Sequence, residues 1–274
     1  MKAGAGMRAD GPIFLPCHFG EWLQGRIGPD GPLALVTLVP KGVSLTAWHR
    51  PARGLCSHAI GHGALAPAVL ARFSRALGGL RGRTLLRLPY PPGMGTGMST
   101  AGLLAIAGTR PGFAPDLLAR ACIAAEGASD PLMYPAPAQQ LWAAREGRSL
   151  GNLPPQPRAH LLAGFWGPPR PTRAGDQDYD DISDLVNAWQ RGGNLAQRAA
   201  LASESARRCL ARRGPAGDPT EALARALGAL GFAISHSGAA RALIFPPGQV
   251  PPHAAAALRE VGLRGVHRLA TCGA

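Results

Sequence analysis

The sequence predicts an α+β fold in two parts. A chain of 274 residues with 46% hydrophobic composition can bury a sizeable core, as one large domain or two modest ones. A proline-rich segment, residues 152–173, separates the two halves. In the second half, the expected order of strand, helices, two strands, helix and strand is typical of an antiparallel sheet covered by helices. We therefore expect two domains, over residues 1–155 and 156–274.

The elements of the first half follow from apolar runs and from the residues that bound them. Residues 28–31 predict a turn before an apolar strand. Pro115 suits an early helical position, because its missing N–H needs no partner there, and Gly127 can end that helix in the left-handed conformation. We expect strands over residues 12–17, 33–39, 43–48 and 84–88, and helices over residues 64–77, 101–107, 115–126 and 139–147.

The second half has a more regular pattern. Four apolar residues between Ile182 and Trp189 lie at helical spacing and predict one buried helix face. Asp218, followed by proline and by Glu221, has the pattern of a helix start. We expect strands over residues 160–166, 232–235, 242–245 and 266–271, and helices over residues 182–189, 194–213 and 253–261 and from residue 218.

The segment over residues 89–101 is the most informative part of the chain. Gly93, Gly95 and Gly97 follow an expected strand and precede an expected helix. A glycine loop in this place suits a phosphate, because the N–H groups of the first helical turn point at the anion and the helix dipole favours negative charge. By itself, the loop is equally compatible with a turn that binds nothing.

Two common phosphate-binding motifs do not fit this loop. A P-loop needs a lysine before its Ser or Thr, but Met98 precedes Ser99, and Lys2 and Lys41 are the only lysines. The Rossmann motif needs a glycine at the position that Met98 occupies.

The chain resembles the GHMP small-molecule kinases. Their motif P-x-x-x-G-[LM]-[GA]-S-S is similar to residues 89–97, where Thr96 stands for the first serine and Gly97 for the second. Within that superfamily, the chain is most similar to the L-threonine kinases of cobalamin biosynthesis, which are associated with propanediol utilisation. Residues 16–25 are similar to their P-x-x-x-G-E-x-x-Q-G signature, and residues 235–238 to their H-S-G turn.

This resemblance implies a fold and a reaction. The N-terminal domain would be like ribosomal protein S5 domain 2 and the C-terminal domain ferredoxin-like, with ATP and the substrate bound between them. The reaction would transfer a phosphoryl group from ATP, with Mg²⁺, to the hydroxyl of L-threonine. Another amino alcohol or hydroxy acid is an alternative acceptor. A protein that binds a nucleotide or metabolite without catalysis is an alternative of a different class.

The resemblance also implies roles for individual residues. Thr96 and Glu126 would bind Mg²⁺, which prefers oxygen ligands. Asp130 would act as a base or orient the substrate hydroxyl. Glu21 suits an ammonium group, and Gln24 a carboxylate or hydroxyl. The expected ATP-binding residues are Pro92, Gly93, Met94, Gly95, Thr96, Gly97, Met98 and Ser99. The expected substrate-binding residues are Glu21, Gln24, His236, Ser237 and Gly238.

Simpler structural roles stay open for some of these residues. Glu126 would otherwise be a solvated helix end, Glu21 an exposed charge at a strand end, and Asp130 part of a turn with the proline that follows it. Arg145 is a candidate for phosphate contact or a solvated helix residue. His18 and His236 are candidates for structural roles as much as for catalysis.

Three departures from the family pattern bear on activity and substrate. Gly97 lacks the hydroxyl of a family serine. Thr100 stands where the threonine kinases carry an Asp. The spacing from Glu126 to Asp130 is one residue longer than the family pattern.

Composition limits the remaining classes of function, partner and location. The formal net charge of +13 suits an anionic substrate such as a nucleotide. The arginines are scattered, and three Tyr and seven Phe offer few stacking platforms, so a nucleic-acid partner is not expected. The five cysteines lack paired spacing, which predicts reduced thiols. Without a signal peptide or an apolar run of about 18 residues, we expect a cytoplasmic protein with no membrane partner. A homodimer is left open.

Overall fold

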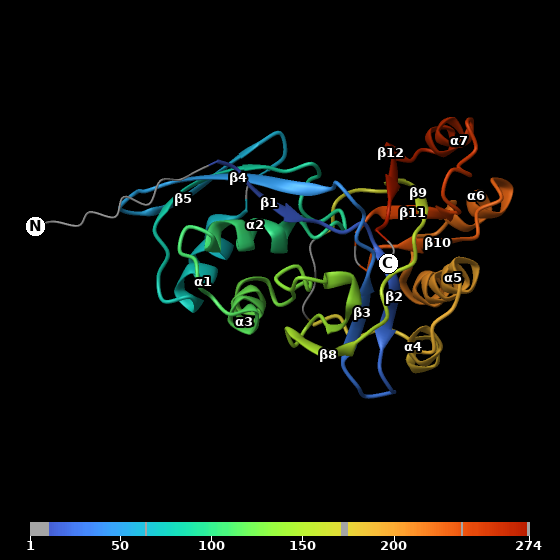
Figure 1. Ribbon diagram of the computed structural model, residues 1–274, viewed down its shortest axis with the longest axis horizontal. Coiled ribbons are helices and arrows are strands. Elements are labelled where there is room, and N and C mark those ends of the chain that lie inside the picture. The colour runs from blue at the N-terminus through green and yellow to red at the C-terminus, as the bar shows by residue number, and fades with distance from the viewer. Residues whose placement is uncertain (1–10, 64, 171–174, 237, 273–274) are drawn as a thin grey trace, which may run out of the picture.

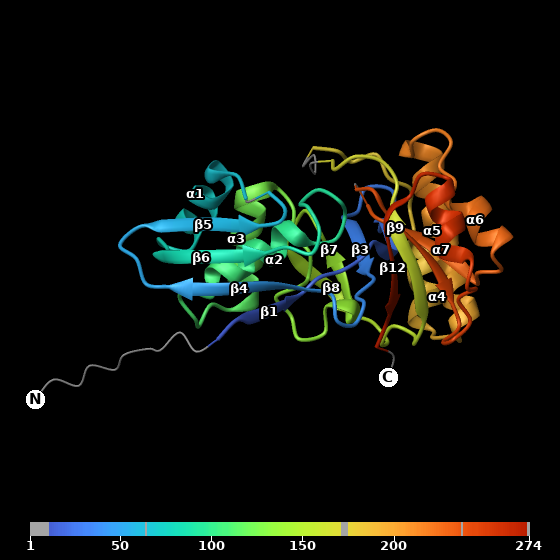
Figure 2. The ribbon, with the colours of Figure 1, turned by 90° about the horizontal axis from the view of Figure 1, so that it is seen from above.

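The computed structural model describes residues 11–63, 65–170, 175–236 and 238–272. Two β-sheets follow one another along the long axis of the molecule (Figures 1 and 2). A four-stranded sheet with helices α1 to α3 forms one end, and an eight-stranded sheet with helices α4 to α7 forms the other. No helix in the described ranges is long and apolar enough to cross a membrane.

The four-stranded sheet belongs to the first half of the chain and is covered on one face. Buried and exposed residues alternate along β6 (Gly82–Arg87), so that Thr84 and Leu86 face the interior while Arg83 and Arg87 face solvent. The strand order is β1 (Ile13–Pro16), β4 (Ser44–Arg50), β6 (Gly82–Arg87) and β5 (Leu55–Ile60), in which only β5 and β6 pair in parallel. The covering helices are α1 (Pro67–Ala76), α2 (Met98–Ala107) and α3 (Pro115–Glu126).

The eight-stranded sheet pairs its neighbouring strands antiparallel and combines both halves of the chain. Its order is β12 (Arg264–Ala270), β9 (His160–Phe165), β11 (Ala240–Phe245), β10 (Gly231–Ile234), β2 (Glu21–Arg26), β3 (Leu33–Thr37), β7 (Gln140–Ala143) and β8 (Arg148–Asn152). The helices beside it are α4 (Ser183–Gln190), α5 (Leu195–Arg213), α6 (Thr220–Ala226) and α7 (Ala254–Glu260).

The sheet continues across the predicted domain boundary at residue 155. Ile234 of β10 pairs with Glu21 of β2, and this pairing joins the strands of the second half to those of the first. The predicted domains therefore share one sheet, and the boundary itself stays a prediction.

Several expected elements are confirmed because short-range signals define them. α3 begins at Pro115, and Gly127 ends it with φ of +74°. Asn194 caps α5 in a capping box with Gln197. Asp218 accepts hydrogen bonds from the backbone N–H and the hydroxyl of Thr220, and α6 begins at Thr220, two residues after the expected start.

Two parts of the expected pattern are wrong. The helix expected over residues 139–147 is instead a 3₁₀ turn, Pro137–Gln139, followed by β7 and the hairpin to β8. All four residues of β7 are buried in the large sheet, so the tertiary environment overrides the helical tendency of alanine. β2 and β5 were not expected, since β2 is interrupted by polar residues and Gly25, and β5 contains Cys56 and His58.

Three aromatic rings fasten the glycine loop to the second sheet. Phe19, Tyr90 and Phe165 pack with ring centroids 5.0–5.6 Å apart, and they come from the β1–β2 loop, the segment after β6, and β9. Phe19 is fully buried. Pairs of this geometry each contribute about 0.5–1.5 kcal/mol beyond area burial. This packing sets where the loop meets the eight-stranded sheet.

Candidate active site

The glycine loop lies between β6 and α2, and its backbone carbonyls are held from outside. Gly93, Gly95 and Gly97 have φ of +84°, +80° and +69°. Four successive carbonyls, of residues 93 to 96, accept hydrogen bonds of 2.9–3.2 Å from the backbone N–H groups of Arg170, Ala240, Gly20 and His18. These four hydrogen bonds fix the position of the loop backbone relative to the β1–β2 loop, β11 and Arg170.

Close packing requires glycine in this loop, in addition to backbone conformation. A Cβ at Gly95 would overlap the side chain of Ser235, and a Cβ at Gly97 would lie 2.8 Å from His18 Nε2. Gly238, on the other side of the contact, would place a Cβ 2.5 Å from the Met94 carbonyl oxygen. The loop, the β1–β2 segment and the β10–β11 segment are therefore in van der Waals contact at glycine positions.

Helix α2 starts immediately after the loop and leaves its first turn open. Gly97 is the N-cap residue, and no side chain among the described residues caps this end. The hydroxyl of Ser99, in the first turn, donates a hydrogen bond to the Glu126 carboxylate at the end of α3. Burial raises the pKa of Glu126, while the Ser99 hydrogen bond and the Arg72 charge oppose that rise.

The hydroxyl that meets Glu126 is thus that of Ser99. The Thr96 side chain is 1% exposed, and its hydroxyl oxygen has no hydrogen-bond partner among the described residues. The family resemblance predicts Thr96, and not Ser99, as the hydroxyl that binds a metal together with Glu126. The deciding feature is that α2 begins at Met98, which turns the next residue toward α3.

A buried histidine lies between two carboxyl groups beside the loop. His18 Nδ1 is 3.5 Å from Glu21 Oε1, and His18 Nε2 is 3.4 Å from Asp130 Oδ2. The side chains of His18 and Glu21 are 4% and 2% exposed, whereas that of Asp130 is 21% exposed. Among these three, Asp130 is the most exposed. Its backbone N–H donates to the Thr100 hydroxyl oxygen at 3.3 Å, which fixes its position.

The charges of this cluster follow from burial and proximity. Burial opposes protonation of His18, but the carboxylates of Asp130 and Glu21 raise its pKa to about 9. Burial raises the pKa of Glu21 to about 8. For Asp130, burial is outweighed by His18, whose charge and hydrogen bond lower the pKa. At neutral pH, an imidazolium therefore stands beside an ionised Asp130 and a protonated Glu21.

The same three side chains are close enough to surround a cation, because their ligand atoms lie within 4.8 Å of one another. An imidazolium has no lone pair to offer a metal, however, and the raised pKa of His18 favours that form. The cluster is better described as a buried ion pair with a neutral carboxyl group.

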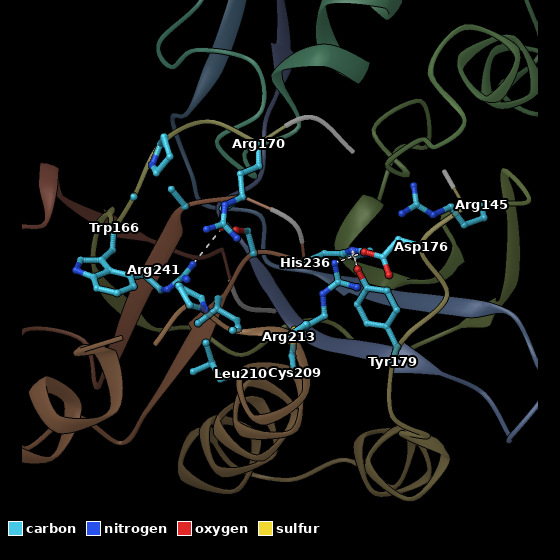
Figure 3. A pocket seen from close by; sticks show the side chains of 18 residues that line it. Arg145, Trp166, Arg170, Asp176, Tyr179, Cys209, Leu210, Arg213, His236 and Arg241 are labelled. Carbon is cyan, nitrogen blue, oxygen red and sulfur yellow. Dashed lines mark hydrogen bonds and ion pairs between the residues drawn. The ribbon is translucent and has the colours of Figure 1, made fainter. Parts of the chain in front are cut away.

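Most of the expected site residues line one small cavity of about 90 Å³. Its lining includes His18, Glu21, Gly93, Gly95, Thr96, Gly97, Met98, Ser99, Asp130 and His236, together with Arg145 and Arg170. A larger cavity of about 560 Å³ adjoins it and shares Arg145, Arg170 and His236 with it (Figure 3). Gly238 lines the larger cavity, and Met94 lines a third, beside Tyr90.

Other expected site residues lie elsewhere. Pro92, Gln24 and Glu126 are absent from the described lining of these cavities. Gln24 is 2% exposed, and its amide donates to the Ile234 carbonyl, so it joins β2 to β10. Ser237 lies outside the described residues.

His236 is present at the site as a neutral residue. Its Nδ1 lies 3.0 Å from the Tyr179 hydroxyl. Burial, together with the charges of Arg145 and Arg213, lowers the pKa of His236 to about 3. Arg170 and Tyr179 belong to no recognisable motif, so the sequence did not predict them at the site. Arg170 lies in the proline-rich segment, residues 152–173, and Tyr179 lies between that segment and α4.

Comparisons with known proteins identify the fold. No protein-family model and no curated protein sequence matches the chain. Solved structures do match. One is described as a phosphotransferase related to the CoA biosynthesis pathway, with a TM-score of 0.63 and 14% identity over 96% of each chain.

Two named kinases are similar to the same extent. A mevalonate kinase from L. major, in complex with R-mevalonate, has a TM-score of 0.62 and 12% identity over 100% of this chain and 99% of that one. A homoserine kinase from Cytophaga hutchinsonii has a TM-score of 0.59 and 13% identity over 100% and 98%. The chain therefore has the α+β fold of the GHMP kinases, as its sequence predicts.

Proposed function

We propose that the protein is an ATP-dependent kinase that phosphorylates the hydroxyl group of a small molecule, with L-threonine as the first acceptor to test. The observation that supports this most strongly is the small cavity. There, the glycine loop, the open end of α2 and an ionised Asp130 face one space. Phosphoryl transfer asks a protein mainly for positioning and for neutralisation of charge, and these groups supply both.

ATP phosphates would lie on the loop and the first turn of α2. The N–H groups of that turn have no side-chain cap among the described residues, and the helix dipole favours an anion there. Held carbonyls at residues 93 to 96 keep the loop in place. This matches the ATP-binding role expected for residues 92–99.

Ser99 and Glu126 fit the requirements of Mg²⁺. A hydroxyl and a carboxylate in contact beside a phosphate site are the oxygen donors that Mg²⁺ prefers, and Mg²⁺ keeps its remaining ligands as water and phosphate oxygen. When bound there, the ion would neutralise charge on the transferring phosphates. We assign the hydroxyl ligand to Ser99 in preference to Thr96, whose oxygen is enclosed in the protein.

This assignment moves the family motif by two residues. With Ser99 as its last serine, the motif begins at Pro91, and Gly95 and Gly97 occupy its glycine positions. Gly97 then stands where the family has Gly or Ala, rather than in place of a serine. Two departures result: Thr96 stands where the family has Leu or Met, and Met98 stands for the first serine.

Asp130 would receive the proton of the acceptor hydroxyl. The acceptor oxygen forms a bond to the γ-phosphorus, the bond from the γ-phosphorus to the bridging oxygen breaks, and ADP leaves. The hydroxyl proton passes to the Asp130 carboxylate, which His18 keeps ionised. With L-threonine, the product would be O-phospho-L-threonine, the compound that the resemblance connects with cobalamin biosynthesis.

Release of ADP tests the activity. Purified protein with Mg²⁺ and ATP is incubated with L-threonine, other amino alcohols and hydroxy acids. Acceptor-dependent release supports a kinase, and its dependence on L-threonine supports the finer assignment. Turnover with another alcohol alone would replace threonine as the acceptor. Binding of ATP without turnover for any acceptor would refute the kinase and favour a binding protein.

Asp130→Asn tests the mechanism. We expect kcat to fall by about 10²-fold or more, because general-base catalysis is worth that much, while ATP affinity is retained. Asp30→Asn is the matched control, since Asp30 is exposed in a turn. A near-normal kcat in Asp130→Asn would remove this residue from the mechanism. The homodimer and the absence of a nucleic-acid partner stay predictions.

A further inference from the structure

The larger cavity beside the site is strongly basic. Among its described lining residues are four arginines, Arg145, Arg170, Arg213 and Arg241, against one carboxylate, Asp176 (Figure 3). Its volume of about 560 Å³ falls in the range of pockets that enclose a small-molecule ligand.

The arginines reach the cavity from separate segments and differ in the contacts that they already make within the fold. Arg241 is 4% exposed and holds Asp218 at 2.7 Å, so its charge is used within the fold. Arg213 pairs with Asp176 and stacks on Tyr179 at 4.0 Å. The Arg170 side chain has no hydrogen bond or ion pair with any described residue, and it is exposed. It is therefore available to a ligand.

Two of these arginines stand where the cavities meet. Arg145 and Arg170 line both the larger cavity and the small one that contains Asp130 and the glycine loop. A molecule whose hydroxyl lies at Asp130 would therefore direct its other end toward guanidinium groups. Guanidinium groups bind carboxylate and phosphate oxygens well, because their donors form a planar fork.

The electrostatics of the cavity agree with this geometry. Arg145 and Arg213 together help to keep His236 neutral, and burial and the charge of Arg213 lower the pKa of Arg145. Positive charges this close repel one another until an anion enters between them. The neutral His236, with Nε2 buried and unpartnered among the described residues, can add a hydrogen bond.

The cavities offer little to an ammonium group. Glu21, Asp130 and Asp176 are the only carboxyl groups in their described linings. Glu21 is enclosed and its pKa is raised, Asp130 faces His18, and Asp176 pairs with Arg213. Each of these carboxyl groups is therefore already protonated or paired with a cation of the protein, and none is left to pair with the amino group of an acceptor.

We propose that the larger cavity is the binding subsite for the acid group of the acceptor, and that the acceptor is an anionic alcohol recognised through its carboxylate or phosphate, with no amino group required. This inference rests on the proposed kinase function and narrows its substrate class. It places Arg170 and Arg145 as the residues that hold the acid group.

Calorimetric titration without ATP separates the contributions of the functional groups. The probes are L-threonine, 3-hydroxybutyrate, which lacks the ammonium group, threoninol, which lacks the carboxylate, and glycerol 3-phosphate. We expect 3-hydroxybutyrate to bind at least as tightly as L-threonine, and threoninol at least about 10-fold more weakly, because it loses a charge-assisted pair. Tighter binding of glycerol 3-phosphate than of 3-hydroxybutyrate would identify the acid group as phosphate, and the reverse would identify a carboxylate.

The variant Arg170→Met tests whether Arg170 binds the acid group. This exposed side chain can be replaced without loss of a contact to a described residue, and thermal unfolding verifies the fold. We expect the best acid probe to bind about 10-fold more weakly or worse. Arg191→Met, which removes an exposed arginine outside the cavities, is the control and should bind normally. Equal binding of threoninol and L-threonine, or unchanged acid binding in Arg170→Met, would overturn the subsite.

The two proposals fail in different ways. If ADP is released with an acceptor while Arg170→Met binds that acceptor normally, the kinase stands and the acid subsite is refuted. If acid probes bind in an Arg170-dependent manner while no acceptor releases ADP, the subsite stands and the kinase is refuted.

Discussion

Substitution of Gly97 tests how the loop and the catalytic cluster are packed together. Gly97 has φ of +69°, a conformation that costs a residue with a side chain about 1–2 kcal/mol. A Cβ there would lie 2.8 Å from His18 Nε2 and 3.0 Å from Leu132 Cδ1. Both neighbours are buried, so neither can swing into solvent to make room.

The expected loss in free energy of unfolding is the sum of a backbone cost and an overpacking cost. Overpacking of a tight interior costs about 1–3 kcal/mol, because side chains leave their preferred rotamers. Added to the backbone cost, Gly97→Ala should lower the free energy of unfolding by about 2–5 kcal/mol. The displaced ring would also leave Asp130, which lies 3.4 Å away, so kcat should fall as well.

A double-mutant cycle separates backbone strain from the clash. His18→Ala removes the ring, so in that background Gly97→Ala should keep the backbone cost and the contact with Leu132 Cδ1. The expected coupling energy is about 1–3 kcal/mol, the part of the overpacking that is due to the ring. Gly28→Ala is a matched control, since Gly28 has φ of +80° and a Cβ there would meet nothing within 4 Å. It should cost only about 1–2 kcal/mol.

Urea unfolding followed by tryptophan fluorescence measures these differences. The comparison needs wild type, both single variants, the double variant and Gly28→Ala. If Gly97→Ala costs no more than Gly28→Ala, or costs the same with and without the His18 ring, then the ring does not occupy the space beside the loop, and the account of the cluster is wrong.

Two further predictions concern the metal and the protons. Ser99→Ala should raise the Mg²⁺ concentration for half-maximal activity by about 10-fold or more, as should Glu126→Gln, and an unchanged Mg²⁺ titration would place the ion elsewhere. Glu21 and His18 keep their protons in the fold up to pH values of about 8 and 9, well above their ordinary pKa values of 4.5 and 6.5. The folded state thus binds more protons, so the free energy of unfolding should fall as pH rises from about 4.5 to 9, through Glu21 alone below about 6.5 and through both groups above it. Glu21→Gln should flatten this fall below pH 8, and a slope equal to that of wild type would show that Glu21 is ionised in the fold.

The sequence was a good guide to elements whose ends are set by neighbouring residues. Pro115, Gly127 and Asn194 act through their own backbone or the next turn, so the bounds of α3 and α5 could be predicted closely. β2 is different. Its residues are nearly all buried because it lies inside the sheet, between strands from opposite halves of the chain. No local pattern reveals such a position.

The candidate site likewise contains features that local sequence predicts and features that depend on tertiary packing. Motif spacing predicts the loop, Glu126 and Asp130 as site residues and Thr96 as the hydroxyl ligand, whereas the hydroxyl that contacts Glu126 is that of Ser99. That depends on where α2 starts and on how it packs against α3. The basic cavity was beyond prediction for a similar reason, since Arg145, Arg170 and Arg213 come from segments that meet only in the folded chain.

The three segments that carry the family resemblance form one continuous contact in the fold. Backbone N–H groups of His18 and Gly20, in the first segment, hold the carbonyls of Thr96 and Gly95. The third segment meets the same loop, because Ser235 lies where a Gly95 side chain would be.

This contact explains why the three short motifs, which lie far apart along the chain, are found in the same sequence. A bulkier residue in any of them would shift the loop carbonyls that the other two hold, and with them the N–H groups offered to phosphate. The third segment also carries His236 into both cavities, so a shift of the phosphate loop would move the acceptor site at the same time. Under the proposed function, the phosphate and acceptor positions would therefore be coupled through this contact, and substitutions at residues 235 or 238 should alter affinity for both ligands rather than one.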